Sequence, residues 1–251
     1  MALAYQTALT IESVIKDIDS KKYLLPSIQR EFVWSTGQIE KLFDSLMRDY
    51  PINAFLFWKV PREKVSEFKF YEFLRDYHQK DNKHNPKANT NGTEDIIAIL
   101  DGQQRMTSLY IALKGTYAYK MSYKRWDNPA AYPKRKLYLN LLAASDDADM
   151  FYDFLFLTEE EAKNIKNDND EYEGSFWFPV GKILDFREES DVNDYLIDND
   201  LNTVADKAQA KFANKALFKL YSVIHNKQTI SYYLEESTEL DKVLNIFIRV
   251  N

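Results

Sequence analysis

The segment Asp101-Gly102-Gln103-Gln104-Arg105 places an acid, a glycine, two carboxamides and an arginine side by side. A guanidinium is suited to bidentate contacts with phosphate or carboxylate. A carboxylate can hold a magnesium ion or orient a water, as phosphoryl transfer requires. The segment therefore has the groups of a phosphate-binding site. An Asp-Gly turn whose arginine pairs with a nearby acid is the alternative interpretation.

The elements expected around this segment are a buried strand and a helix. Residues 96–100 form an uninterrupted, β-branched apolar run, which predicts a buried strand. Apolar residues then recur at helical spacing, which predicts a helix over residues 103–119. A helix that starts after a glycine leaves backbone N–H groups unpaired, and its dipole favours an anion. The sequence thus predicts an anion-binding corner.

Further motifs occur in a fixed order along the chain. They are Ile28-Gln29-Arg30 with Val33-Trp34, a predicted helix over 38–49, Tyr50-Pro51-Ile52, a predicted strand over 54–60, the segment 101–105, and Phe247-Ile248-Arg249-Val250-Asn251. This order resembles the N-terminal domain family of GmrSD-type modification-dependent restriction systems, a relative of the ParB and sulfiredoxin-like fold. The resemblance is dense over residues 9–113, thin over 114–235, and returns at 238–251.

The resemblance implies a fold class and an activity. The fold would be α+β, with a ParB/sulfiredoxin-like mixed sheet and helices followed by a helix-rich appended region. The activity would be binding and Mg²⁺-dependent hydrolysis of a nucleoside triphosphate, within a modification-dependent (type IV-like) restriction or phage-defence protein. DNA would be a partner of the full-length protein, together with a C-terminal nuclease region or partner subunit.

The resemblance also implies site residues, carried over position by position. The catalytic set would be Asp101, Gln103, Gln104 and Arg105, with Asp101 as the magnesium ligand. The nucleotide-binding set would be Gln29, Arg30, Gly102, Arg105, Arg249 and Asn251. We expect Arg30 and Arg105 to converge on one pocket and neutralise phosphate charge. Either Gln103 or Gln104 would position the attacking water.

Two other functions compete with hydrolysis. The first is a non-hydrolytic module that senses a nucleotide or modified DNA through the same pocket. The second makes this domain itself a nuclease, which no His/Asn/His cluster in the sequence supports. We expect the nuclease centre in a separate C-terminal region. The family pattern continues beyond its final asparagine into a glycine-containing turn, so the chain is expected to be an N-terminal fragment.

Composition excludes several classes of protein. The 251 residues include no cysteine, which removes disulfides, thiol chemistry and the reductase chemistry of the sulfiredoxin branch. A P-loop is missing, because six residues separate Gly174 from Gly181 and Ile183 follows Lys182 where Ser or Thr is needed. The three histidines lack the spacing of a zinc site. We expect a cytoplasmic protein, since no membrane span or signal peptide is evident.

Charge is unevenly distributed along the chain. Residues 1–145 carry a net charge of +6, residues 146–200 a net charge of −14, and residues 201–251 a net charge of +2. This asymmetry predicts a nucleotide-binding core at 1–145, followed at 146–251 by an acidic and then helical appended region. An acidic chain binds DNA poorly overall, but its basic first half can present a basic face locally.

Residues 114–136 combine basic and aromatic side chains, as nucleic-acid surfaces do. The candidate nucleic-acid contacts are Lys120, Lys124, Arg125, Lys134, Arg135 and Lys136, interleaved with four tyrosines and a tryptophan. An edge hairpin is the alternative, with aromatic rings packed inward and lysines that prevent edge pairing. The sequence alone favours the hairpin, because one segment does not reveal which faces are exposed.

Overall fold

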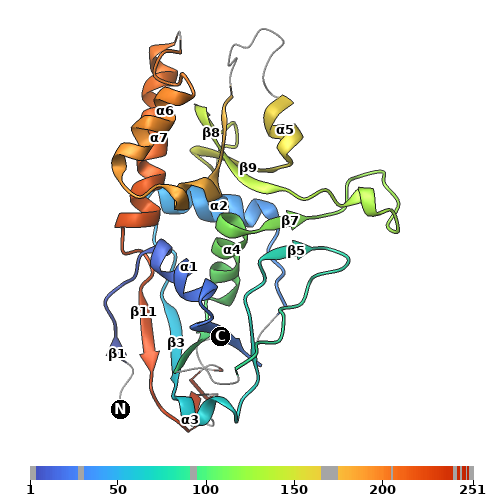
Figure 1. The fold of residues 1–251 in the computed structure, drawn as a ribbon, viewed down its shortest axis with the longest axis vertical. Helices are drawn as coiled ribbons and strands as arrows, with labels where there is room; N and C mark the ends of the chain where they lie inside the picture. Colours follow the sequence, from blue (N-terminus) through green and yellow to red (C-terminus); the bar gives the residue numbers. More distant parts are fainter. Residues whose placement is uncertain are drawn as a thin grey trace.

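The computed structural model describes residues 4–27, 31–90, 95–164, 175–204 and 206–239, together with residues 242, 243, 245, 246 and 248. The molecule is elongated (Figure 1). A large sheet and its helices occupy the lower half, and a second sheet with α6 and α7 lies above them. The strands β5 and β7 lead into a projection at one side.

The large sheet is mixed, which confirms the α+β class. Its six strands lie in the order β1-β11-β3-β6-β2-β4. Their bounds are β1 Ala4–Tyr5, β2 Tyr23–Pro26, β3 Phe55–Val60, β4 Phe70–Tyr71, β6 Ile96–Asp101 and β11 Tyr232–Glu235. β6 pairs parallel with β2 and antiparallel with β3, and β11 pairs parallel with β3. Aromatic residues among charged neighbours predict a strand over residues 67–73, but only Phe70–Tyr71 form one.

Three helices lie in the core beside this sheet and bury apolar faces set by their sequences. They are α1 Ile11–Asp19, α2 Thr36–Met47 and α4 Gln103–Lys114. Thr10 caps α1 by accepting a hydrogen bond from the Ser13 N–H, as its sequence predicts. Ser35 and Gln38 form a capping box on α2. The buried faces of the three helices share one core cluster.

A second, three-stranded sheet has the order β10-β8-β9. Its strands are β8 Lys136–Ala144, β9 Tyr152–Leu157 and β10 Trp177–Pro179. The predicted division between residues 145 and 146 falls in the connection between β8 and β9, which pair with each other. Apolar and aromatic runs in the sequence predict strands over residues 136–142 and 150–157, and β8 and β9 confirm both. β9 lies at an edge of this sheet and would leave N–H groups unpaired.

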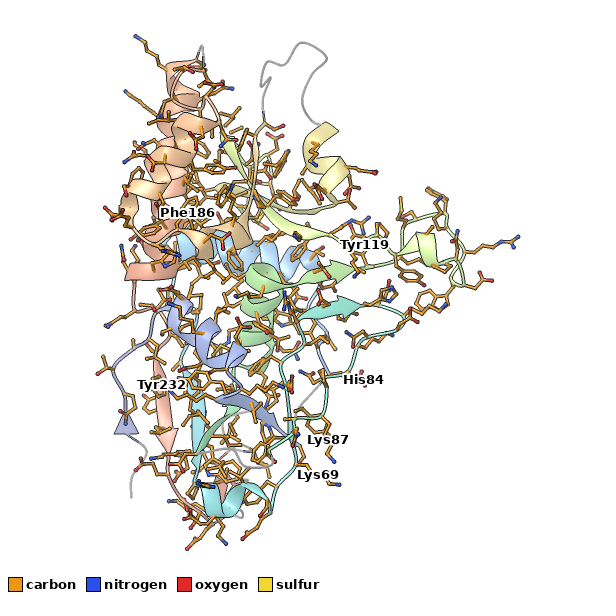
Figure 2. All side chains as sticks on the ribbon, viewed as in Figure 1. Lys69, His84, Lys87, Tyr119, Phe186 and Tyr232 are labelled. Atoms are coloured by element: carbon orange, nitrogen blue, oxygen red, sulfur yellow. The ribbon has the colours of Figure 1, made fainter. Side chains whose placement is uncertain are left out.

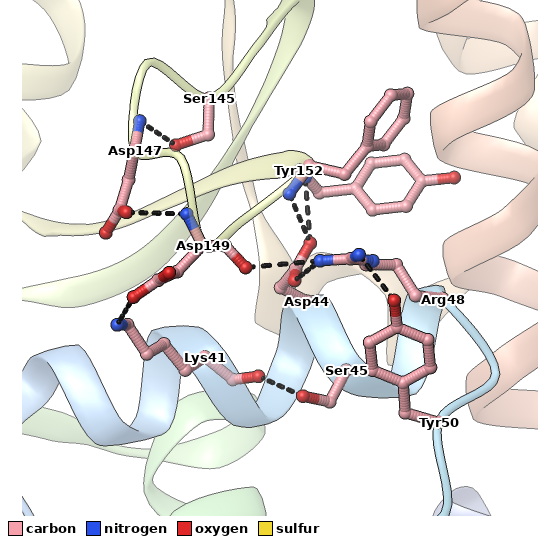
Figure 3. A network of polar contacts seen from close by, with 10 residues as sticks. Lys41, Asp44, Ser45, Arg48, Tyr50, Ser145, Asp147, Asp149 and Tyr152 are labelled. Atoms are coloured by element: carbon pink, nitrogen blue, oxygen red, sulfur yellow. Dashed lines mark hydrogen bonds and ion pairs between the residues drawn. The ribbon is translucent and has the colours of Figure 1, made fainter.

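Carboxylates of α2 pair with that edge. The Asp44 carboxylate, 3% exposed, accepts hydrogen bonds from two consecutive N–H groups, those of Phe151 and Tyr152, both at 2.9 Å (Figure 3). Arg48 donates to the other oxygen of Asp44 at 3.2 Å. One turn earlier, Glu40 accepts from the Phe156 N–H at 3.0 Å. Burial raises the pKa of Glu40 to about 7, and the nearby Asp153 adds to the shift.

The remaining helices and turns lie mostly in the second half of the chain. They are α3 Arg62–Val65, the 3-10 turns Pro129–Ala131 and Val180–Asp185, α5 Glu159–Asn164, α6 Glu189–Asp198, α7 Lys207–Tyr221 and the π-helical turn Ser222–Asn226. The sequence predicts helices over residues 191–198 and 203–225, and α6 and α7 are present there with shifted ends. The acidic composition of residues 167–174 predicts a loop, which lies outside the described residues. Among the described helices, none is long and apolar enough to span a bilayer.

One helix differs from its prediction because of a contact distant in sequence. The helix expected over 103–119 ends at Lys114. At Gly115 a Cβ atom would lie 1.7 Å from the Arg75 carbonyl oxygen, so the chain passes against another backbone there. β7 (Thr116–Ala118) follows and pairs parallel with β5 (Asp76–His78). Apolar spacing alone does not show this change of structure.

Candidate functional site

The predicted corner is present where β6 meets α4. Gly102 is the N-cap residue of α4, with φ 84° and ψ 12°, in the left-handed region. A Cβ atom at this position would lie 2.2 Å from Cδ1 of Phe55. L-residues rarely adopt this backbone conformation, and the ring leaves no room for a side chain. Only glycine therefore fits the corner.

A β-bulge precedes the glycine, and Gln103 binds to it. β3 and β6 lose register between Leu56 and Phe57, which leaves Leu100 as an extra residue in β6. The side-chain amide of Gln103 donates to the carbonyls of Ile99 and Leu100, at 2.9 and 3.3 Å. Gln103 therefore supplies hydrogen bonds at the point where the strand ladder is disrupted.

Gln104 binds the segment that follows Gln29-Arg30. Its Oε1 accepts from the Val33 N–H at 3.0 Å, and its Nε2 donates to the Glu31 carbonyl at 2.8 Å. A carboxamide that makes both bonds imitates a neighbouring backbone strand. Gln104 thereby fixes residues 31–33 beside the first turn of α4.

Arg105 binds the loop between α2 and β3. Its guanidinium donates to all three carbonyls of residues 52–54, at 3.0 Å for the second and 3.2 Å for the third. It also stacks on the Phe55 ring, 4.4 Å from the centroid, and lies 3.5 Å from Asp101. Burial lowers the pKa of Arg105 while Asp101 opposes that shift. A guanidinium nevertheless stays charged in proteins.

Asp101 and the helix backbone are the groups that remain for a ligand. The Asp101 carboxylate contacts the Arg105 side chain and is 29% exposed. Met106 is the first residue of α4 whose N–H bonds back to the Gly102 carbonyl, at 2.9 Å. The N–H groups of Gln104 and Arg105 precede that first helical bond, and Gly102 has no side chain to cap them. The corner therefore combines a carboxylate with the positive end of a helix dipole.

The structure brings three of the four motifs together at the start of α4. Gln104 binds the first motif at residues 31–33, and Arg105 binds the second at residues 52–54. The predicted nucleotide-binding residues Gln29, Arg30, Arg249 and Asn251 lie outside the described residues. Near the chain's end, the Trp58 indole donates to the Ser237 carbonyl at 2.9 Å.

The described residues contain no group of three or more His, Asp or Glu side chains arranged to hold a metal ion. Asp101 is a single carboxylate. Mg²⁺ bound with a nucleotide commonly takes one or two carboxylates plus phosphate oxygens and waters. The Asp101 corner fits that donor set. It does not fit a metal site made of protein ligands alone.

The predicted nucleic-acid residues divide into two groups. Lys120 and Arg135 point into the structure: the Lys120 ammonium donates to two turn carbonyls, and Arg135 is 4% exposed. The exposed group is Lys124, Arg125, Lys134 and Lys136. The preferred hairpin interpretation therefore describes only part of this segment.

Phe55 is a site residue that sequence reasoning missed. Its ring fills the space above Gly102 and carries the Arg105 guanidinium. The only sequence signal is its place three residues after Ile52 of the Tyr-Pro-Ile motif, at the start of an apolar strand. That position predicts burial, but it does not indicate which residues the ring contacts.

Comparison with known proteins gives two findings. Residues 11–251 match the family described as GmrSD restriction endonuclease, N-terminal domain. An uncharacterized protein of Methanocaldococcus jannaschii is 33% identical over 113 residues. The aligned stretch is 45% of this chain and 18% of that relative, so the chain matches a small part of the relative's length.

Proposed function

The chain belongs to the GmrSD restriction endonuclease N-terminal domain family, and from this premise we propose that it binds and hydrolyses a nucleoside triphosphate with Mg²⁺. The observation that carries the proposal is the meeting of three family motifs at the N-terminus of α4. Restriction of DNA by the whole protein is part of the same proposal. Its nuclease centre would lie outside this chain.

The proposed roles depend on which side chains of the corner already bind the backbone of the protein itself. The N–H groups of Gln104 and Arg105 would donate to phosphate oxygens, helped by the helix dipole. Asp101 would hold the ion or orient the attacking water, and Mg²⁺ would supply charge neutralisation on the phosphates. Gln103, Gln104 and Arg105 bind backbone carbonyls, which gives them positioning roles. They hold the corner and its two neighbouring loops in place.

A second function is supported by the contacts of Arg105. Its guanidinium is bound to three carbonyls and to Asp101, so other residues would have to neutralise the transferred phosphoryl group. A non-hydrolytic sensor of a nucleotide or modified DNA has no such requirement. Asp101 would be required for turnover by a hydrolase, whereas a sensor would bind its ligand without turnover.

The test compares two aspartate variants. Asp101→Asn keeps the size of the side chain and an acceptor for Arg105 but removes the charge. We expect hydrolysis to fall by about 100-fold or more, the scale for loss of a group that stabilises the transition state. Asp95→Asn is the matched control, since Asp95 lies just before β6, at the opposite end of the strand, and pairs with Lys59 at 3.6 Å. It should leave turnover unchanged.

The measurements are phosphate release and calorimetric binding with each of the four common triphosphates and Mg²⁺. Binding without turnover in the unmodified chain would favour the sensor. Absence of triphosphate binding would contradict both hydrolysis and nucleotide sensing, and would leave only the sensing of modified DNA. Melting temperatures of both variants report whether the fold is intact.

A further inference from the structure

A projecting arm is formed by two segments, residues 76–84 and 116–136. β5 and β7 pair in parallel at its base, with Tyr77 opposite Tyr117. Residues 117–135 leave the body and return, and the excursion closes where the backbones of Tyr117 and Arg135 exchange hydrogen bonds at 2.8 and 3.1 Å. Figure 1 shows this arm standing clear of both sheets, and Figure 2 places Tyr119 where it leaves the body.

The arm has its own small core, which fixes its tip. Ala118, Ala131 and Tyr132 form a separate buried cluster. The Tyr132 ring packs edge-on against Trp126, with the centroids 5.8 Å apart, and its hydroxyl donates to the Trp126 carbonyl at 2.9 Å. The Lys120 ammonium donates to two carbonyls of the turn, at 3.1 and 2.9 Å. The tip is therefore a packed turn.

This packed turn places an aromatic side chain in solvent. Tyr123 has φ 66°, a conformation that bulky residues rarely adopt, and its side chain is 104% exposed. Trp126 is half exposed beside it. Neither ring contributes its full area to folding. A strained, fully exposed tyrosine on a well-packed turn is a feature expected of a contact site.

The arm is basic on an otherwise acidic chain. Its two segments hold eight Lys and Arg against three Asp, a net charge of +5, whereas the whole chain carries −6. Among the described residues, no carboxylate lies within 4 Å of the exposed arm cations, which are Lys80, Lys124, Arg125, Lys134 and Lys136. The lysines of α1, α2 and α3 are paired with acids by contrast. The arm cations therefore remain available for phosphates.

The same side of the molecule continues the basic surface. Lys69 and Lys87 lie along the edge below the arm (Figure 2). Both side chains are exposed, and neither has a carboxylate partner among the described residues. The cations thus extend from the arm along one edge, as contact with a long polyanion requires.

We propose that the arm binds duplex DNA, with Lys124 and Arg125 on backbone phosphates and Tyr123 packed against a base or sugar. Unpaired cations beside an exposed ring favour a nucleic acid over a protein, because protein interfaces are depleted of lysine. Among nucleic acids we choose DNA, because the family of this chain is described as a domain of a restriction endonuclease. The proposal rests on that restriction function and does not depend on nucleotide hydrolysis.

The test is fluorescence anisotropy of a labelled ~30-base-pair duplex, a length able to span several phosphate contacts, titrated with the 251-residue chain without nucleotide. The double variant Lys124→Glu/Arg125→Glu should lower affinity about tenfold or more. It should also reduce the slope of log affinity against log salt by ~0.9 for each phosphate that the arm no longer neutralises. Lys211→Glu/Lys215→Glu is the charge-matched control, because both lysines are exposed on α7. That control should change affinity less than twofold, an expectation that follows from phosphate binding being confined to the arm.

Two substitutions test whether the ring of Tyr123 contributes to DNA binding. Tyr123→Ala should weaken binding about fivefold or more, because the apolar contact of the ring with the DNA is lost, whereas Tyr123→Phe should bind as the unmodified chain does. Equal affinities for the two charge-reversal variants would overturn the proposal and leave the arm to a protein partner. Loss of DNA binding in the arm variants, with nucleotide binding intact, would support the DNA-binding role of the arm without bearing on the corner. Loss of nucleotide binding in Asp101→Asn, with intact DNA binding, concerns only the corner.

Discussion

The Phe55 ring occupies the space that any side chain at position 102 would need. A Cβ atom at Gly102 would lie 2.2 Å from Cδ1 and 2.6 Å from Cε1 of that ring. The ring also supports the Arg105 guanidinium, which itself approaches the same Cβ position at 3.2 Å. The glycine, the ring and the arginine are thus mutually dependent, and changing any of them disturbs the other two.

Gly102→Ala should destabilise the corner strongly. The methyl group would clash with Phe55, and the backbone conformation at φ 84° would be strained. We expect a loss of about 2–4 kcal/mol in the free energy of unfolding, measured by denaturant titration. Gly37→Ala in α2 is the control, since the nearest atom to its Cβ is 3.9 Å away. That change should be neutral or stabilising by up to ~1 kcal/mol.

Arg105→Lys should lower the stability of the fold more than it lowers the affinity for a ligand. A single ammonium does not reproduce the planar fork that binds the carbonyls of residues 52–54. We expect the free energy of unfolding to fall by about 1–3 kcal/mol. Arg75→Lys is the control, because it alters one exposed guanidinium hydrogen bond, to the Lys114 carbonyl. Its free energy of unfolding should lie within ~0.5 kcal/mol of that of the unmodified chain. Unchanged stability combined with abolished nucleotide binding would instead give Arg105 a direct phosphate contact.

Gln104→Ala should release residues 31–33 from α4. The Val33 N–H would lose its acceptor, so its amide hydrogen should exchange about tenfold faster, which corresponds to loss of one hydrogen bond. Hydrogen-exchange NMR measures this directly. Gln79→Ala removes a comparable acceptor, that of the Lys120 N–H, from the arm and should leave Val33 protected. Unaltered exchange at Val33 would refute the role of Gln104.

Glu40→Gln should change how stability depends on pH. Burial raises the pKa of Glu40 to about 7, above the ordinary 4.5, so the folded state holds this proton more tightly than the unfolded state. Stability from this group is complete below pH 4.5 and is lost as the pH rises through 7. Glutamine keeps an acceptor for the Phe156 N–H without ionising.

We therefore expect Glu40→Gln to be more stable than the unmodified chain at about pH 8, by about 1–2 kcal/mol. This value is lower than the full conversion of the pKa shift because the side chain is only partly buried. At pH 4.5, the ordinary pKa of the group, the two proteins should melt at similar temperatures. A stability difference that does not vary between these pH values would rule out titration of Glu40 as its cause.

Local features of the fold were predictable because their causes lie within a few residues. The caps Thr10 and Ser35 precede their helices directly, and Gly102 separates an apolar run from a helical pattern. The sequence therefore predicts the start of α1 and the corner correctly, but it places the start of α2 at residue 38, two residues too late. The sequence does not predict the early end of α4, because its cause is the approach of the distant Arg75 backbone to Gly115.

The candidate site shows the same division. Motif order predicts the family, which the match over residues 11–251 confirms, whereas the functional role of residues 101–105 stays a prediction. The partners of Gln104 and Arg105 lie about 50–70 positions away, so no local pattern shows that both side chains bind backbone carbonyls. Long-range pairing of this kind is set by tertiary packing. The proposed roles of Gln29, Arg30, Arg249 and Asn251 stay predictions.

Helix α4 has the corner at one end and the arm at the other. Gly102 precedes its first residue, and Gly115 leads from its last residue into β7. Twelve residues with a rise of about 1.5 Å each give a rod of about 18 Å. A helix of this length resists compression, so the number of its residues sets the spacing between the two ends. The helix therefore fixes the distance between the corner and the arm, and a displacement of the corner along the helix axis would move the base of the arm by the same amount.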